Sequence, residues 1–328
     1  MNIYDIAKEA GVSTATVSRV MNNKPNISPH TLKRVKAVLD KYNYVPSSIA
    51  RGMTSKSMNL VGVVMRDIRH PHYNSFAYTI EQALYNNGYS CILSNVSDCN
   101  PGLTFKIFSQ IKVDGIIIIG SDFMNAATEQ AITDYQAQTP IVFVNGFFDK
   151  PNVTNILADD RAGIMLCMEH LFKTGRRKPV YVNDNITDSA KRKREGFMDV
   201  MMRNGYTDFN DRIIESALGF EGGKKCGEII LEKYKGDVDC VICIEDTTAL
   251  GCLRAFETAG VNVPGDIAIT GYNNSAENKM AHKVLTSVDT KLEMMGLEAA
   301  TALYDKMNGK VRASKLTISP ELFIGETT

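Results

Sequence analysis

The sequence has no hydrophobic run long enough to cross a membrane. Its longest run of aliphatic side chains, residues 116–119, holds four isoleucines, whereas a membrane-spanning helix needs about 20 apolar residues. The chain opens on Met-Asn-Ile-Tyr-Asp, which lacks the basic stretch and apolar run of a secretory signal peptide. We therefore expect a cytoplasmic protein with no membrane partner.

Histidine is scarce, and the cysteines suggest neither a metal site nor a disulfide framework. The five histidines and the dispersed acidic residues give no metal-ligand spacing, and His70 and His72, on either side of Pro71, fit a surface loop. Seven cysteines are an odd number, which favours reduced thiols. Cys240 and Cys243 lie three apart in a strand-like segment, so they point to opposite faces and fit the core. We expect no metal and no cofactor.

Motifs of the common enzyme classes are missing as well. The sequence has no glycine-rich phosphate loop ending in Lys-Ser or Lys-Thr, and no Gly-x-Ser-x-Gly nucleophile elbow. The segment Gly120-Ser121-Asp122 follows a strand-like run, but it is too short a signal to indicate catalysis. We therefore expect a protein that is not an enzyme.

A net charge of zero conceals an uneven distribution of charge. Residues 1–58 hold nine Lys and Arg against three Asp and Glu, a net charge of +6, so the remaining residues carry −6. A basic segment is the electrostatic signature of a polyanionic partner such as a nucleic acid. The 328 residues are also enough for two or three cores, so we expect a small basic domain followed by a larger acidic region.

The basic segment has the apolar spacing of a helix-turn-helix. Two short helices share an apolar side, and Gly11 lies between them, where a tight turn favours a residue without a side chain. Ser13 is placed to cap the second helix, residues 14–22, and Ser28 and Pro29 open a third helix. The inward positions are Ile6, Ala7, Ala10, Val12, Val17, Val20 and Met21 in the first two helices and Leu32, Val35, Val38, Leu39 and Tyr42 in the third.

The outer side of the second helix has the chemistry of a major-groove reader. Thr14 can hydrogen-bond to a base edge, Ala15 can touch a thymine methyl group, and the guanidinium of Arg19 matches the O6 and N7 atoms of guanine. A solvated face of some other three-helix module is the alternative. The outward positions are Thr14, Ala15, Thr16, Ser18, Arg19 and Asn22.

From residue 60 onward, strand-like runs alternate with amphipathic, helix-length stretches. Strands are expected at residues 60–65, 90–94, 115–119 and 141–145, with helices near 76–87, 103–111 and up to 136. The pattern then repeats, with strands at 179–182, 241–244 and 267–272 and helices at 163–174, 194–204, 222–235 and 247–259. This alternation predicts α/β lobes with parallel sheets covered on both faces, and a ligand cleft between the lobes at the carboxyl ends of the strands.

Residues 4–22, 27–31 and 44–53 closely resemble the head of the lactose and galactose repressor (LacI/GalR) family of bacterial transcriptional regulators. The resemblance implies a helix-turn-helix domain at residues 1–45, a hinge helix and linker at 46–58, and an effector-binding and dimerisation domain at 59–328. The expected DNA contacts are Tyr4, Ser13, Thr14, Ala15, Thr16, Ser18, Arg19, Asn22, Asn26, Ser28, Thr31, Ser47, Ala50 and Met53.

The hinge departs from the pattern of this family at two positions. The family inserts a leucine into the minor groove and kinks the DNA there, whereas this chain has Met53 at that position; methionine is also an accepted apolar wedge. Ser47 stands where asparagine is usual. A plain polar linker is the alternative, and both can hold because a segment that orders on binding looks weakly structured beforehand.

The resemblance continues through residues 113–117, 169–171, 195–197 and 263–267, which look like the effector domain of the family and its periplasmic sugar-binding relatives. Lys193 stands where that family usually has a ligand-gripping arginine, Glu245-Asp246 where Asn-Asp is usual, and Asn273-Asn274 where acids are common. These exchanges should alter ligand choice. The expected effector contacts are Asp67, Tyr73, Asn145, Ser189, Lys193, Phe220, Asp246 and Asn273.

These observations predict a homodimeric, sequence-specific repressor of carbohydrate catabolism or transport genes. Its partners would be a palindromic double-stranded operator and a small-molecule effector, a sugar or sugar derivative, which switches operator affinity from the cleft between the lobes. The alternatives are a catabolite-control regulator switched by a phosphorylated protein and a regulator with a purine-like co-repressor. A periplasmic receptor would keep the cleft, but it would need an export signal and no basic head.

Overall fold

The computed structural model describes residues 2–21, 24–44, 57–135 and 139–328. The chain divides into two compact units, Met1–Met58 and Asn59–Thr328. Along the part of the chain that the structure describes, no helix is both long and apolar enough to cross a membrane.

The first unit is a three-helix domain, α1 (Ile3–Glu9), α2 (Thr14–Met21) and α3 (Pro29–Lys41). The predicted caps are confirmed: the Ser13 hydroxyl accepts a hydrogen bond from the Thr16 N–H at 3.2 Å, and Ser28 does the same for Thr31. Gly11 adopts φ +59° in the turn between α1 and α2. The helices enclose a small core of Ile6, Ala7, Ala10, Val17, Val20 and Val35.

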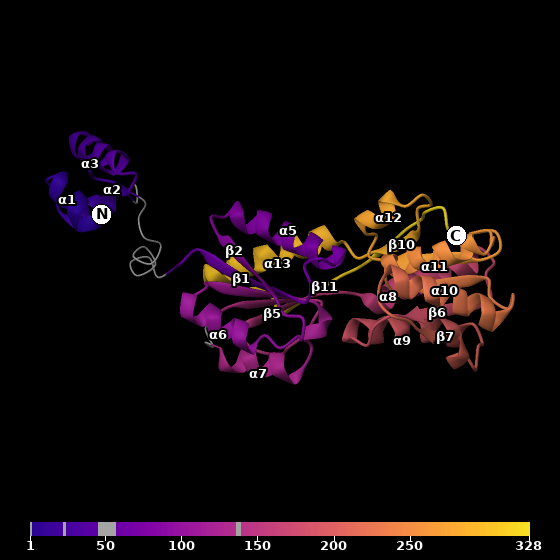
Figure 1. Ribbon diagram of the computed structural model, residues 1–328. Helices are drawn as coiled ribbons and strands as arrows, with labels where there is room; N and C mark the ends of the chain where they lie inside the picture. The colour runs from indigo at the N-terminus through magenta and orange to yellow at the C-terminus, as the bar shows by residue number, and fades with distance from the viewer. Residues whose placement is uncertain (1, 22–23, 45–56, 136–138) are drawn as a thin grey trace. The chain divides into compact units, whose positions relative to one another are not determined.

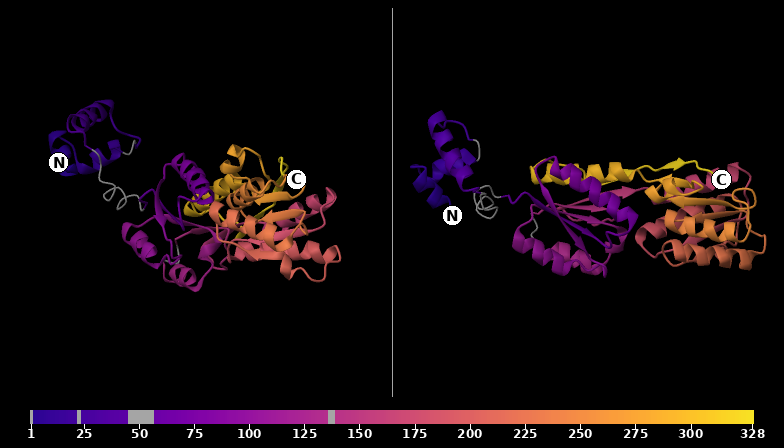
Figure 2. Two further views of the ribbon diagram at one scale, coloured as in Figure 1. Left: turned by 45° about the vertical axis from the view of Figure 1, so that its right-hand side comes forward. Right: turned by 45° about the horizontal axis from the view of Figure 1, so that its top comes forward.

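The second unit consists of two α/β lobes, each built on a six-stranded sheet (Figures 1 and 2). The first sheet has the order β11-β5-β4-β3-β1-β2, and all its strand pairs are parallel. Its strands are β1 (Leu60–Met65), β2 (Ser90–Asn95), β3 (Gly115–Ile119), β4 (Ile141–Val144), β5 (Val153–Ala158) and β11 (Lys315–Ile318).

Helices cover both faces of the first sheet, which explains why its central strands are apolar without alternation. On one face α5 (Pro71–Tyr85) packs beside α13 (Leu292–Met307), and on the other lie α6 (Gly102–Ile111) and α7 (Ala126–Asp134) (Figure 1). A short 3₁₀ turn, η1 (Ser121–Phe123), follows β3.

The second sheet has the order β12-β10-β9-β8-β6-β7. It is parallel except for β12, the last strand in the sequence, which runs antiparallel to β10. Its strands are β6 (Pro179–Asn183), β7 (Ile213–Glu215), β8 (Cys240–Cys243), β9 (Ala268–Tyr272), β10 (Thr286–Asp289) and β12 (Glu321–Phe323). Cys240 and Cys243 enter the cores on opposite faces of this sheet, as their spacing predicts.

Two pairs of helices cover the second sheet. On one face are α8 (Asp160–Lys173) and α9 (Asp188–Arg203), and on the other α10 (Phe220–Tyr234) and α11 (Asp246–Thr258). The turn η2 (Asn210–Arg212) precedes β7, and the short helix α12 (Ala276–Met280) precedes β10. The parallel, doubly covered sheets that the sequence pattern predicts are therefore confirmed.

The chain crosses between the lobes three times: from β5 to α8, from β10 to α13, and from β11 to β12. The sequence pattern does not anticipate the return of α13 and β11 to the first lobe. Two predicted helices also begin earlier than expected: α5 begins at Pro71 rather than near residue 76, and α9 at Asp188 rather than 194. In α9 the Thr187 hydroxyl accepts the Ala190 N–H and sets this start.

Candidate nucleic-acid interface and ligand cleft

The outer side of α2 is accessible in the first unit. Ala15 and Arg19 are exposed, and Thr14, Thr16 and Ser18 are half-buried beside them. Arg19 donates one guanidinium hydrogen bond to the Pro25 carbonyl at 3.2 Å, which holds the side chain along the helix while its remaining N–H groups stay available.

The other predicted DNA contacts in the described part of the head are also at its surface. Tyr4 is 72% exposed, Asn26 is exposed with φ +67°, and Thr31 is half-buried at the start of α3 beside exposed Ser28. The predicted contacts Asn22, Ser47, Ala50 and Met53 lie outside the described residues.

In the second unit, a cavity of about 200 Å³, hereafter the cleft, lies where the strands of both sheets end. Much of each wall comes from segments that follow strands, as expected for open α/β sheets. From the first lobe come segments after β1, β3 and β4, and from the second lobe segments after β6, β7, β8 and β9. Tyr73 of α5 and Lys193 of α9 also line the cleft. Members of the lining are Arg66, Asp67, Tyr73, Ser121, Asp122, Asn145, Asn185, Thr187, Ser189, Lys193, Leu218, Glu245 and Asn273.

A carboxylate organises the wall of the first lobe. Asp122 pairs with Arg66 at 2.6 Å and accepts a hydrogen bond from the Tyr73 hydroxyl. Burial, followed by the charge of Asp122, raises the pKa of Tyr73, so the phenol stays protonated as a donor. Asp67 is held by Arg69 at 2.7 Å, and its hydrogen bonds to Arg69 lower its pKa to about 2.

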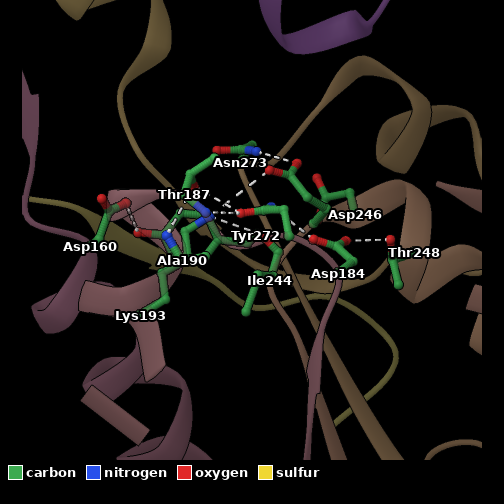
Figure 3. Close-up of polar contacts among 12 residues, drawn as sticks. Asp160, Asp184, Thr187, Ala190, Lys193, Ile244, Asp246, Thr248, Tyr272 and Asn273 are labelled. Carbon is green, nitrogen blue, oxygen red and sulfur yellow. Dashed lines mark hydrogen bonds and ion pairs between the residues drawn. The ribbon is translucent and has the colours of Figure 1, made fainter. Parts of the chain in front are cut away.

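Lys193 lies at the centre of the wall of the second lobe (Figure 3). Its side chain is buried, donates from Nζ to the Ile244 carbonyl at 2.9 Å, and lies 3.8 Å from the centroid of the Tyr272 ring. Glu245 Oε1 is 3.9 Å from the same Nζ.

Two carboxyl groups, Glu245 and Asp184, interact electrostatically with this lysine. A third, Asp246, follows Glu245 in the chain. Burial raises the pKa of Glu245 to about 8 and that of Asp246 to about 6, and it also raises the pKa of Asp184. Asn273 donates to Glu245 at 2.6 Å, and Thr248 donates to Asp184 at 2.5 Å, a contact that Figure 3 draws as a dashed line.

Six of the eight predicted effector residues line the cleft: Asp67, Tyr73, Asn145, Ser189, Lys193 and Asn273. Asp246 lines an adjoining cavity of about 390 Å³ instead. Its two carboxylate oxygens accept hydrogen bonds from the Ser287 hydroxyl at 2.6 Å and the Ser275 N–H at 2.7 Å. These bonds tie α11 to the segments around α12 and β10.

Phe220 lies outside the cleft. It is 44% exposed and lines a separate surface hollow with residues of α11 and α12. Gly219 has φ +88°, and the residues on its two sides face different cavities, so Leu218 rather than Phe220 lines the cleft. A role for Phe220 in stacking on a ligand in the cleft is not supported by this position.

The surface-loop interpretation of His70 and His72 is wrong. Both lie at the start of α5, line the cleft and the adjoining cavity, and have a buried Nδ1 with no hydrogen-bond partner among the described residues. Burial lowers the pKa of His72 to about 3 and also lowers that of His70, so both rings are neutral. Across the described ranges, no cluster of three His, Cys, Asp or Glu could hold a metal ion.

Sequence reasoning missed Asp122 in the cleft and Asp184 near Lys193, and it named Glu245 only as an exchange that should alter ligand choice. Each of the three follows a strand within a few positions, so the rule that places ligands at the carboxyl ends of parallel strands could have found them. Asp122 stands in a short segment without an enzyme motif.

Comparison with known families gives two matches. Residues 58–327 match the periplasmic binding proteins and sugar binding domain of the LacI family, and residues 2–47 match the bacterial regulatory proteins of the lacI family. The HTH-type transcriptional regulator DegA of Bacillus subtilis (strain 168) is 31% identical, over 99% of this chain and 97% of its own. Catabolite control protein A of Staphylococcus xylosus is 30% identical, over 94% of this chain and 93% of its own.

Solved structures show the same fold. The lac repressor dimer bound to operator and the anti-inducer ONPF has a TM-score of 0.88 at 23% identity. The alignment covers 100% of this chain and 98% of the lac repressor chain. The transcriptional regulator CelR in complex with cellobiose has a TM-score of 0.72 at 22% identity, and the alignment covers 100% of both chains.

Proposed function

The chain belongs to the LacI family of bacterial transcriptional regulators, and on this premise we propose that it is a homodimeric repressor whose operator affinity is switched by a carbohydrate bound in the cleft. It is a DNA-binding regulator with a ligand-binding domain. The repressor role, the dimer, the sugar class of the effector and the cytoplasmic location are the proposed parts.

The lining of the cleft is the observation that carries the proposal for a carbohydrate. Hydroxyl groups of a sugar both donate and accept hydrogen bonds, and the cleft offers carboxylate acceptors beside amide and hydroxyl groups. Asp122, Asn145 and Glu245 stand at the ends of different strands around one cavity, so a small polyol could bind both lobes at once.

The three crossover segments give the switch a physical basis. Asp160 and Thr290 belong to two of these crossovers and line the cleft. A ligand that contacts both lobes favours the lobe arrangement that it binds best, and the crossovers are the points where that arrangement changes. We propose that the change alters the spacing of the two hinge segments, residues 46–58, in the dimer, and so alters operator affinity.

Exposed apolar side chains on the second unit support self-association. Tyr78 and Tyr85 on α5 are each 66% exposed, and Met280 on α12 is 77% exposed. Contiguous exposed apolar surface marks protein interfaces, and Tyr78 and Tyr85, seven residues apart, lie on the same side of α5. A two-fold dimer would present two copies of α2 to successive major grooves of one duplex face.

Selection from a random library of DNA duplexes tests the proposal. Purified protein should enrich a palindromic sequence at moderate salt, and fluorescence anisotropy on that duplex should respond to one class among hexoses, pentoses, disaccharides, sugar phosphates and purines. A response to a sugar phosphate or a purine would point to the corresponding regulator class, and a response only with a phosphorylated protein would point to catabolite control. Failure to prefer any duplex over random competitor would contradict DNA recognition itself.

A further inference from the structure

Around the innermost part of the cleft, the described residues place two carboxyl groups, Glu245 and Asp184, beside one cation, Lys193. From this excess of carboxyl groups, and resting on the proposed function, we infer that the effector is an amino sugar whose ammonium group pairs with Glu245.

Lys193 has two close partners other than Glu245. It is 4% exposed, donates to the Ile244 carbonyl at 2.9 Å and lies over the Tyr272 ring. An ammonium held by a carbonyl and an aromatic face is well compensated. Its separation of 3.9 Å from Glu245 exceeds a hydrogen-bond length, so Lys193 only partly neutralises that carboxylate.

Two carboxyl groups share this single lysine. Glu245 has a neutral donor, the Asn273 amide, at 2.6 Å. Asp184 also has neutral donors, the Thr248 hydroxyl at 2.5 Å and the Asn185 amide at 2.9 Å. Burial, with a smaller contribution from the charge of Asp184, raises the pKa of Glu245 to about 8 although Lys193 opposes the shift, so a second cation beside Glu245 would favour its ionised form.

Among the described residues, the arginines of this region are paired with carboxylates. Arg66 is paired with Asp122, Arg69 with Asp67 and Arg192 with Asp160 at 2.8 Å. His70 and His72, at the start of α5, are neutral. On the side of the adjoining cavity, Lys291 is paired with Glu321, and Lys279 lines the cavity together with Asp289 and Glu293.

There is space and a set of acceptors beside Glu245. Its side chain lines both the cleft of about 200 Å³ and the adjoining cavity of about 390 Å³. Thr290, which is 3% exposed, lines the cleft with a hydroxyl that has no hydrogen-bond partner among the described residues, and the same holds for Nδ1 of His70 and of His72. An ammonium has three N–H donors, and this region offers it a carboxylate and neutral acceptors.

Competing ligand classes fit less well. A phosphorylated sugar would bring further negative charge toward Glu245 and Asp184, in a region whose arginines are already paired. A neutral sugar would satisfy hydrogen bonds but would supply no cation to favour the ionised form of Glu245. A charge-assisted N⁺–H···O⁻ bond is about twice as strong as a neutral one, so an amine should gain most from this site.

The test is isothermal titration calorimetry on the full chain with matched hexoses. D-glucosamine, D-galactosamine and D-mannosamine are each compared with the parent hexose and the N-acetyl derivative. For at least one hexose we expect the amine to bind roughly tenfold or more tightly than both neutral forms, which corresponds to about 1.4 kcal/mol. Binding should also release protons from the Glu245–Asp184 pair, seen as different heats in buffers of different ionisation enthalpy.

Substitutions at Glu245 separate a binding role from a structural one. Glu245→Gln should remove the preference for the amine and leave the melting temperature of the unliganded protein equal or higher, whereas Glu245→Asp should keep part of the preference. Glu228→Gln, on the exposed side of α10, is the matched control and should bind as the parent does.

Two results would overturn the inference: binding of none of the three amines at millimolar concentration, or tighter binding of a neutral hexose than of its amine. Neither result would contradict the proposed function if a neutral sugar still changed operator affinity. Loss of operator recognition altogether would instead remove the proposed function.

Discussion

Arg19 is the residue in the described part of α2 that is best placed to read a base. Arg19 is exposed, and its guanidinium donates a hydrogen bond to the Pro25 carbonyl. Arg19→Ala should cost about 1–3 kcal/mol of operator binding and relax the preference at one base pair. Anisotropy titrations on the selected duplex and its single-base variants measure both effects. Equal weakening on every variant would show that Arg19 contacts only phosphate.

Glu245 should make the stability of the unliganded protein fall as the pH rises. Its pKa is raised from 4.5 to about 8, so between these values the folded state holds a proton that the unfolded state has lost. The loss therefore begins near pH 4.5, is complete above about pH 8, and amounts to a few kcal/mol at most. The ordinary value applies in the unfolded chain, where the carboxylate is solvated.

Thermal unfolding of the parent and of Glu245→Gln between pH 4.5 and 9 checks this prediction. The difference between the two proteins should grow in favour of the glutamine variant as the pH rises. A difference that stays constant across this range would mean that Glu245 ionises with an ordinary pKa.

At the scale of elements, the pair α10 and α11 depends on glycine for its close approach. A Cβ atom at Gly223 would lie 2.0 Å from the Thr248 carbonyl oxygen, and one at Gly251 would lie 2.1 Å from the Phe220 carbonyl oxygen. Backbone atoms cannot move aside as a flexible side chain can, so the helices would have to separate.

Gly223→Ala should therefore destabilise the second lobe by about 2–3 kcal/mol. The same change would also disturb Thr248, whose hydroxyl bonds to Asp184 in the cleft, so ligand affinity should fall as well. Denaturant unfolding gives the loss of stability. Glu232→Ala, at an exposed position of α10, is the control and should leave both quantities unchanged; a stable Gly223→Ala variant would contradict the packing argument.

At the scale of the whole molecule, the distribution of charge and the proposed dimer constrain the operator. The first 58 residues carry +6 and the rest −6, so the DNA should contact the head and avoid the acidic unit. Two heads related by a two-fold axis bind two half-sites about one helical turn apart.

Footprinting of the selected duplex should show two symmetric half-sites, and binding should weaken steeply as salt increases. Sedimentation velocity should give a dimer at the same concentrations. A single asymmetric footprint, or a monomer that binds as tightly, would contradict the dimer.

By itself, the sequence determined the helix-turn-helix and most of the alternation of strands and helices up to residue 272, but it did not predict β5 or β7. These features depend on local periodicity, caps such as Ser28, and the apolar strands that bury both faces, all of which neighbouring residues specify. The resemblance to the LacI/GalR family placed Lys193, Asn145 and Asn273 among the expected effector contacts, and all three line the cleft.

Only the tertiary structure decided the path of the C-terminal segment, which returns α13 and β11 to the first lobe and β12 to the second. It also decided the positions of Phe220 and the histidines of α5, and the raised pKa of Glu245. Each of these depends on contacts between residues far apart in the chain: β11 pairs with β5, and Glu245 meets Lys193 and Asn273 from other elements. Local periodicity has no information about such partners, so the charge balance of the cleft follows only from the folded arrangement.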